Sequence, residues 1–381
     1  MHRRPPLPCV KPASTATVPL VLDRVGIAGF RSFAEATVDL RRLNVLVGAN
    51  GSGKSNFIQA FTLLGSIVTE HLQVQTAQWG SASRLLHRGT SPSAAIELNV
   101  VFGQNQYSVR LAPTQGDDLY FEHERVAYQG PGHDKPFTVD LGQGHRETGL
   151  AAEARKYPGK AAAWALGTMN RWVVHHFHDT SAQAPVKLRA EIGDDKALRP
   201  DASNLAAFLF RLQSSHPAHF HRIVEAIRLV APFFEAFDLA PDRHNEQLIQ
   251  LEWRQRASDA YFNAHALSDG TLRFMCLATL LLQPDPPGLI LIDEPELGLH
   301  PYALRQLADL MAASPSQLIV STQSVTLLNW VSLDDVLVVE QRSGASSVDR
   351  LDAGTLAGWL DDYSLGELWE KNLLGGGPSW Q

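Results

Sequence analysis

The stretch Gly48-Ala49-Asn50-Gly51-Ser52-Gly53-Lys54-Ser55 decides the fold of this chain, because it matches the pattern GxxxxGK[ST] in full. An apolar run, Leu43 to Val47, precedes it, and a helical pattern from Lys54 through Leu64 follows it. A phosphate-binding loop requires this order of strand, glycine loop and helix, since backbone N–H groups at the helix N-terminus hold the phosphate. We therefore expect a nucleoside triphosphate at this loop.

Each residue type in the loop has a chemical reason to be there. Glycines let the backbone turn tightly and approach the phosphates closely. Lys54 would neutralise the β- and γ-phosphates, and the Ser55 hydroxyl would ligate Mg²⁺. The alternative, a glycine-rich turn without function, is disfavoured by the flanking strand and helix. The residues expected to bind ATP here are Gly48, Asn50, Gly51, Ser52, Gly53, Lys54, Ser55 and Asn56.

A second apolar run, Leu289 to Ile292, ends in Asp293 and Glu294. In open α/β sheets, ligands bind at the carboxyl ends of the strands, where these two carboxylates would lie. Asp293 would hold Mg²⁺, and Glu294 would polarise the attacking water as a general base. An apolar strand that ends in acidic residues is often purely structural, and the phosphate loop is what gives this strand its functional interpretation.

A third motif, Leu267-Ser268-Asp269-Gly270-Thr271-Leu272-Arg273, opens a long apolar helix. Ser268 or Asp269 could simply cap that helix, but a cap does not require Gly270. The order of phosphate loop, LSxGxxR and acidic strand resembles that of ABC-type ATPases. The resemblance implies that Ser268 and Gly270 contact the γ-phosphate of ATP held by the opposite subunit.

Further short motifs narrow the resemblance. Together they are similar to RecF/SMC-like AAA-type ATPases, and more closely to compact bacterial ATPases that lack a long coiled coil. The similarity extends over residues 20 to 375 and implies an α/β P-loop fold of ABC type, with a mostly parallel sheet and flanking helices. The motifs are Phe30 to Phe33, the phosphate loop, Leu267 to Arg273, Asp293 to Glu296 with Leu299 to Pro301, Ser321 to Ser324, and Tyr363 to Trp369.

One residue departs from the relatives, many of which carry a switch histidine where this chain has Gln323. A glutamine amide donates a hydrogen bond, but it carries neither a proton nor a positive charge. We expect slower or more strictly dimer-dependent hydrolysis, with Gln323 as a catalytic candidate beside Glu294. The glutamine that senses Mg²⁺ in this superfamily stays open among Gln73, Gln75, Gln78, Gln104 and Gln106. Arg84 and Arg88 could contact nucleotide or DNA, or could be surface charges, and Arg31 could approach the nucleotide.

The length of 381 residues exceeds the roughly 250 to 300 at which a single core stops growing, so two lobes are expected. Strands and helices alternate after Leu289, which is typical of a parallel sheet with crossover helices. The middle of the chain reads instead as strands separated by turns, followed by helices. We expect a disordered leader 1–19, an ATPase head built from 20–93 and 249–375, an inserted β-rich and helical lobe 94–248, and a tail 376–381.

Composition excludes several classes of protein. No apolar run approaches the roughly 18 to 20 residues of a membrane span, and two cysteines are too few for a disulfide framework, so we expect a cytoplasmic protein. The net charge of -7 argues only weakly against DNA, because one basic face could still form. On a strand, His176 and His178 would share a face while His175 points away, which is too few ligands for a transition-metal site.

The sequence thus predicts a Mg²⁺-dependent ATPase that hydrolyses ATP to ADP and phosphate. The resemblance implies a homodimer with ATP sandwiched between two chains. The resemblance implies that this switch acts on DNA in repair, chromosome maintenance or phage defence. One alternative is a regulatory ATPase that controls a separate effector protein without touching DNA. Another is the ATP-binding subunit of a transporter, which is disfavoured because Thr271 stands where a transporter commonly has glutamine.

Overall fold

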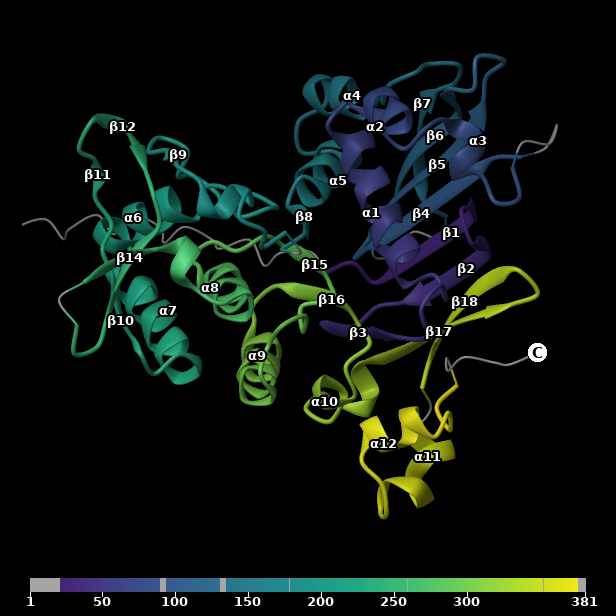
Figure 1. Ribbon diagram of the computed structural model, residues 1–381. Coiled ribbons are helices and arrows are strands. Elements are labelled where there is room, and N and C mark those ends of the chain that lie inside the picture. Colours follow the sequence, from purple (N-terminus) through teal and green to yellow (C-terminus); the bar gives the residue numbers. More distant parts are fainter. Residues whose placement is uncertain are drawn as a thin grey trace, which may run out of the picture.

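A computed structural model describes residues 21–89, 94–130, 135–177, 179–258, 260–351 and 353–375 (Figure 1). The leader predicted at 1–19 and the tail predicted at 376–381 lie outside these residues. Two six-stranded sheets and two three-stranded sheets form the framework of the described part. No helix within it is long and apolar enough to cross a membrane.

The central sheet is mostly parallel, as the alternation of strands and helices predicts. Its strand order is β18-β17-β3-β16-β15-β8, and only β18 runs antiparallel to its neighbour. Side chains on both faces of β15 are buried, because the sheet has a layer on each side. The strands are β3 (Leu43–Val47), β8 (Trp172–His175), β15 (Leu289–Asp293), β16 (Gln317–Thr322), β17 (Val336–Arg342) and β18 (Ala345–Arg350).

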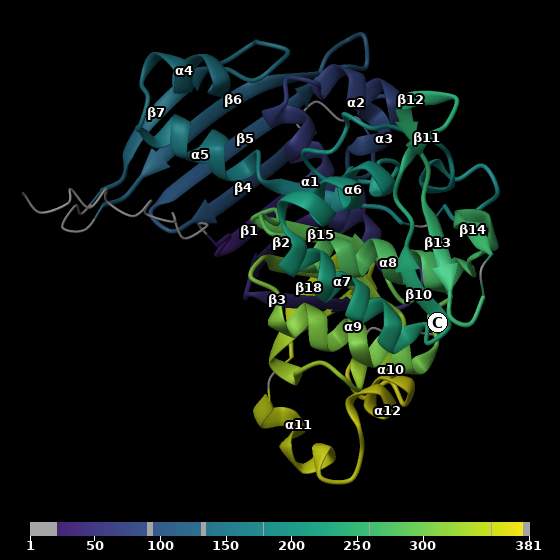
Figure 2. The ribbon, with the colours of Figure 1, turned by 90° about the vertical axis from the view of Figure 1, so that its left-hand side faces the viewer.

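The second large sheet is antiparallel and has the order β2-β1-β4-β5-β6-β7. Helix α1 (Lys54–Val68) packs between this sheet and the central sheet, and its apolar residues belong to the core that both sheets share. Helices α4 (Leu150–Lys156) and α5 (Ala161–Met169) lie along the outer strands (Figure 2). The strands are β1 (Arg24–Phe30), β2 (Phe33–Asp39), β4 (Ile96–Phe102), β5 (Asn105–Pro113), β6 (Leu119–Tyr128) and β7 (Phe137–Gly142).

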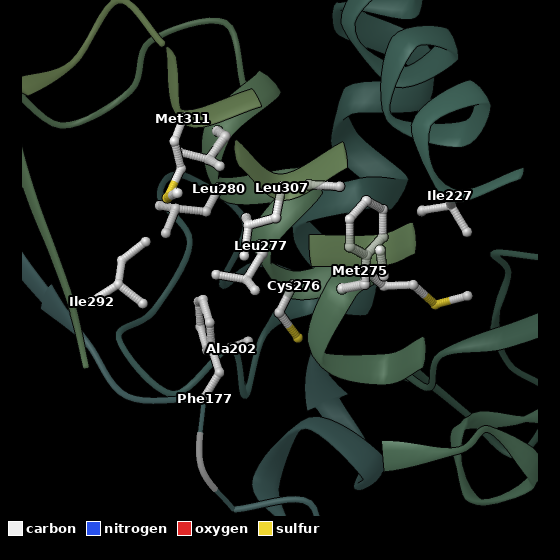
Figure 3. Packing of buried hydrophobic residues seen from close by; sticks show 14 of the residues in the cluster. Phe177, Ala202, Ile227, Met275, Cys276, Leu277, Leu280, Ile292, Leu307 and Met311 are labelled. Atoms are coloured by element: carbon white, nitrogen blue, oxygen red, sulfur yellow. The ribbon is translucent and has the colours of Figure 1, made fainter. Parts of the chain in front are cut away.

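Helices cover the other face of the central sheet. Figure 3 shows Leu280 of α8 beside Met311 of α9, and Met275 of α8 on the side of Ile227 of α7, in this second core. Burial raises the pKa of the Cys276 thiol to about 12. The helices of this layer are α6 (Leu205–Ser215), α7 (Pro217–Val230), α8 (Asp269–Leu282) and α9 (Pro301–Ala313).

The smaller elements complete the description. One small sheet has the order β10-β13-β14 and the other β11-β12-β9. Near the C-terminus, α12 packs on α10, and a Cβ on Gly366 would lie 2.5 Å from the carbonyl oxygen of Val325. The elements are α2 (Leu72–Gln78), α3 (Ala82–Leu85), β9 (Ala190–Glu191), β10 (Phe234–Phe237), β11 (Pro241–Asp242), β12 (Asn245–Ile249), β13 (Glu252–Gln255), β14 (Tyr261–Asn263), α10 (Val325–Leu328), α11 (Ala353–Leu360) and α12 (Leu365–Glu370).

The region 94–248 contributes strands to both large sheets. Strands β4 to β7 continue the sheet that β1 and β2 begin, and β8 pairs with β15 at the edge of the central sheet. We did not predict β8, since its four residues are too short to show a period. The boundaries of an inserted lobe stay a prediction. Strands β4 to β8 and β10 of this region share their sheets with strands from the rest of the chain.

Candidate nucleotide site

Three loops meet at one edge of the central sheet because β3, β15 and β16 are neighbours and run in parallel. In the register of these strands, Val47 lies opposite Thr322, and Asp293 lies opposite Ser321. The phosphate loop follows Val47, and Gln323 follows Thr322. The sheet thus brings together the phosphate loop, the acidic pair Asp293 and Glu294, and Gln323. The sequence predicted the order of these motifs along the chain but not their proximity in space.

The glycines of the phosphate loop are required by geometry. Gly51 and Gly53 have φ angles of 79° and 117°, values that favour glycine. A Cβ on Gly53 would lie 2.3 Å from the hydroxyl oxygen of Ser346, and one on Gly48 would lie 2.3 Å from the carbonyl oxygen of Val339. Strands β17 and β18 therefore pack so closely behind the loop that only glycine fits.

Lys54 lies inside the loop and is only 5% exposed. Its Nζ donates hydrogen bonds to the carbonyl oxygens of Gly48, at 2.7 Å, and Ala49, at 3.0 Å. Burial lowers the pKa of Lys54, and the nearby carboxylates, first of all Glu294, partly offset that effect. The loop thus holds a cation at its centre, while Ser55 is exposed at the start of α1.

Ser321, to which the sequence analysis gave no role, connects the two acidic residues. Its hydroxyl donates to the Asp293 carboxylate. The backbone N–H of Glu294 donates to the Ser321 carbonyl at 3.0 Å and to its hydroxyl oxygen at 3.2 Å. Glu294 has a φ of 42°, in the left-handed region that costs a non-glycine residue energy, and Ser321 helps to hold it there.

Gln323 lies against Glu294, and its side-chain amide donates to the Glu294 carboxylate. The backbone N–H of Gln323 donates to Oε1 of Glu296 at 2.8 Å. Oε2 of Glu296 is buried and makes no hydrogen bond to the described part of the chain. Burial raises the pKa of this carboxyl, although hydrogen bonds from the backbone of Gln323 and Glu296 and from the Thr322 side chain oppose the shift. The sequence motif contained Glu296, but its contact with Gln323 could not be predicted.

Ser268 and Gly270 lie at the start of α8. Ser268 caps the helix by accepting a hydrogen bond from the Thr271 N–H at 3.2 Å. A Cβ on Gly270 would lie 2.0 Å from the carbonyl oxygen of Gly298, so close packing explains this glycine. Ser268 is exposed, as a residue that contacts a second subunit must be. The contact itself stays a prediction.

Several of the other arginine, glutamine and histidine side chains proposed from the sequence have partners within the chain. The Arg31 guanidinium stacks over the Trp79 ring at 4.8 Å, and Arg88 donates to the Ser343 carbonyl at 2.9 Å. The Gln73 amide donates to the carbonyls of Leu119 and Arg146, and the Gln106 amide donates to Asn99 Oδ1 at 2.8 Å. These bonds disfavour both residues as Mg²⁺ sensors and leave Gln75, Gln78 and Gln104 open. His178 lies outside the described residues, among which no group of three metal-ligating side chains occurs.

The two packed sheets and the motifs at the edge of the central sheet define a P-loop ATPase of ABC type, similar to RecF and to the heads of SMC proteins. Residues 43–329 match the family described as "AAA domain, putative AbiEii toxin, Type IV TA system". The match covers well over half of the chain, and the protein belongs to this family.

Individual proteins resemble this chain in part of the sequence or in the fold. The DNA replication and repair protein RecF of Halothermothrix orenii (strain H 168 / OCM 544 / DSM 9562) is 31% identical over 93 residues, which are 24% of this chain and 23% of RecF. An Smc head bound to the C-winged helix domain of ScpA has a TM-score of 0.54 at 17% identity, covering 88% of this chain and 99% of the head. A second Smc head, with an extended coiled coil and bound to the C-terminal domain of ScpA derived from Pyrococcus furiosus, has a TM-score of 0.55 at 16% identity, covering 90% and 98%.

Proposed function

We propose that this protein is an ATP-hydrolysing switch that closes into a dimer around two ATP molecules. The observation that carries the proposal is the meeting of Lys54, Asp293, Glu294 and Gln323 at one edge of the central sheet. A phosphate loop, a metal-binding carboxylate and a general base are the parts that phosphoryl transfer to water needs.

The residues present fit a bound Mg²⁺ ion. The Ser55 hydroxyl and the Asp293 carboxylate offer oxygen ligands, which Mg²⁺ prefers, and Ser321 orients the carboxylate. The ion would neutralise charge on the phosphates. The chain itself supplies the remaining functions: the loop N–H groups and Lys54 hold the phosphates, Glu294 takes a proton from water, and the Gln323 amide keeps Glu294 in place.

The dimer follows from the division of the motifs. Each chain has one phosphate loop and one exposed Ser268. In a two-fold dimer, the Ser268 and Gly270 segment of each chain would close on the ATP of its partner. Loss of the γ-phosphate would then open the dimer, so that hydrolysis would drive a conformational change of the dimer.

The variant Glu294→Gln tests both hydrolysis and dimerisation. Removal of the general base should lower turnover by about 10²- to 10⁴-fold and trap the ATP-bound dimer. Turnover is measured by phosphate release and mass by light scattering with ATP and Mg²⁺. Glu35→Gln, a change at an exposed site on β2, is the matched control and should behave as the wild type. A Glu294→Gln protein that stays monomeric with ATP would refute the sandwich.

DNA is the partner that we propose first, because the RecF relative is a DNA replication and repair protein. Duplex DNA should then stimulate ATP turnover, and the stimulation should fall as salt rises, since phosphate contacts release counterions. The family description, which includes a putative toxin, supports a second candidate, a regulatory ATPase with a separately encoded protein partner. Turnover that is unchanged by DNA but altered by the product of a neighbouring gene would favour this second function.

A further inference from the structure

Glu296 holds the backbone of Gln323 at the point where Gln323 leaves the sheet. Thr322 is the last residue of β16, so the next N–H has no partner in the ladder of the central sheet. That N–H donates to Oε1 of Glu296 at 2.8 Å. A backbone donor inside a protein needs such a partner. Glu296 therefore fixes the direction in which the chain, and with it the Gln323 side chain, continues.

The Gln323 side chain that leaves this point reaches Glu294, to whose carboxylate its amide donates. Two hydrogen bonds thus connect the loop after β15 with the loop after β16. One joins Glu296 to the backbone of Gln323, and the other joins the side chain of Gln323 to Glu294. A shift of the Gln323 backbone would move the amide away from the carboxylate that we assign as the general base.

Glu296 can act as a fixed point because its own loop is anchored. The Leu299 N–H donates to the Glu296 carbonyl at 3.0 Å. The buried Arg273 guanidinium donates to the carbonyl of Leu297. The carbonyl of Gly298 lies against Gly270, at the start of α8. The same loop therefore contacts both the predicted dimer-contact segment and Gln323.

The placement of Glu296 is costly, which argues against a purely structural role. Its Oε2 is buried without a hydrogen bond to the described residues. Buried polar atoms usually have partners, so an unpaired carboxyl oxygen beside the site calls for an explanation. A structural side chain could accept the Gln323 N–H without leaving a second oxygen unpaired.

We propose that Glu296 is a positioning residue of the hydrolytic site, which sets the Gln323 backbone so that the Gln323 amide holds Glu294. This role rests on the proposed ATPase function. Glu296 touches neither nucleotide nor water in this scheme, and it acts only through Gln323.

The test compares Glu296→Ala with Glu296→Gln. Alanine removes the acceptor and should lower kcat about 10- to 100-fold with less than about a threefold change in KM, because misplacement affects chemistry more than binding. Glutamine keeps a carbonyl acceptor at the same place and should restore kcat to within about threefold of the wild type. Loss of kcat in both variants, or in neither, would overturn the role assigned to the acceptor.

A double-mutant cycle with Gln323→Ala tests whether Glu296 acts through Gln323. In that background, Glu296→Ala should change kcat by less than about twofold, because the group that it positions is already gone. Equal losses with and without Gln323 would show independent action and overturn the inference.

Hydrogen exchange at the Gln323 amide provides a measurement independent of turnover. Exchange should speed up by about 10-fold or more in Glu296→Ala and stay near the wild-type rate in Glu296→Gln. A wild type without any turnover would count against the proposed function. In that case unchanged exchange in Glu296→Ala would still overturn the inference, and faster exchange would support its structural part.

Discussion

Glu124 in the antiparallel sheet and Glu296 beside the candidate nucleotide site both have buried carboxyl oxygens. They differ in how many hydrogen-bond donors surround the carboxyl. Glu124 lies on β6 and is completely buried. Every side of its carboxylate is occupied by a donor. The donors are the Tyr107 hydroxyl at 2.6 Å, the Gly149 N–H at 2.8 Å, His145 Nε2 at 2.9 Å and the Thr148 hydroxyl.

The Glu296 carboxyl accepts the Gln323 N–H at 2.8 Å, while its second oxygen is buried without a hydrogen bond to the described residues. The contrast separates two uses of a buried acid. Glu124 connects the segment 145–149 to the sheet. Both of its carboxylate oxygens accept hydrogen bonds, as expected of a buried group with a structural role. Glu296 lies between two loops of a site and joins them through the Gln323 N–H.

The largest effect that would sharpen this contrast is expected at Glu124. In Glu124→Gln, an amide NH₂ would face hydroxyl and N–H donors, and a charge-assisted set of hydrogen bonds would be lost. We expect the free energy of unfolding to fall by about 2 to 3 kcal/mol. Urea denaturation followed by circular dichroism measures this change.

Glu122→Gln, two residues earlier on the same strand, is the control. Glu122 pairs with Arg110 at the surface, and its side chain is 39% exposed, so its loss should cost less than about 1 kcal/mol. Equal losses in the free energy of unfolding for the two variants would show that the four donors around Glu124 add no more stability than a surface ion pair.

The same contrast shows what the sequence could predict. The phosphate loop and the strand that ends in Asp293 and Glu294 are contiguous patterns, and each was read directly from neighbouring residues. The contacts of Glu124 with His145, and of Glu296 with Gln323, join residues 21 and 27 positions apart in the chain. Such pairs depend on sheet register and loop path, which hydrophobic periodicity does not specify. Strand β8 was missed for a related reason, since only its pairing with β15 identifies it.

A smaller effect, on turnover, is expected at Gln323, the residue that Glu296 holds. Gln323→His would place a group that can carry a proton beside Glu294, where the glutamine amide now donates. We expect kcat to rise by about threefold in phosphate-release assays, or hydrolysis to become less dependent on protein concentration and hence on the dimer. An unchanged turnover number would show that the switch position does not limit hydrolysis.

The smallest effect is expected for the unfolding of Glu296→Gln, and it provides the direct comparison with Glu124→Gln. Glutamine keeps the acceptor for the Gln323 N–H and removes a carboxyl whose burial raises its pKa. The free energy of unfolding should therefore stay within about 1 kcal/mol of the wild type, and any change should be an increase. Urea denaturation under the conditions used for Glu124→Gln tests this. A loss as large as that of Glu124→Gln would mean that Glu296 is a structural acid after all, because stability would then depend on its charge just as it does at Glu124.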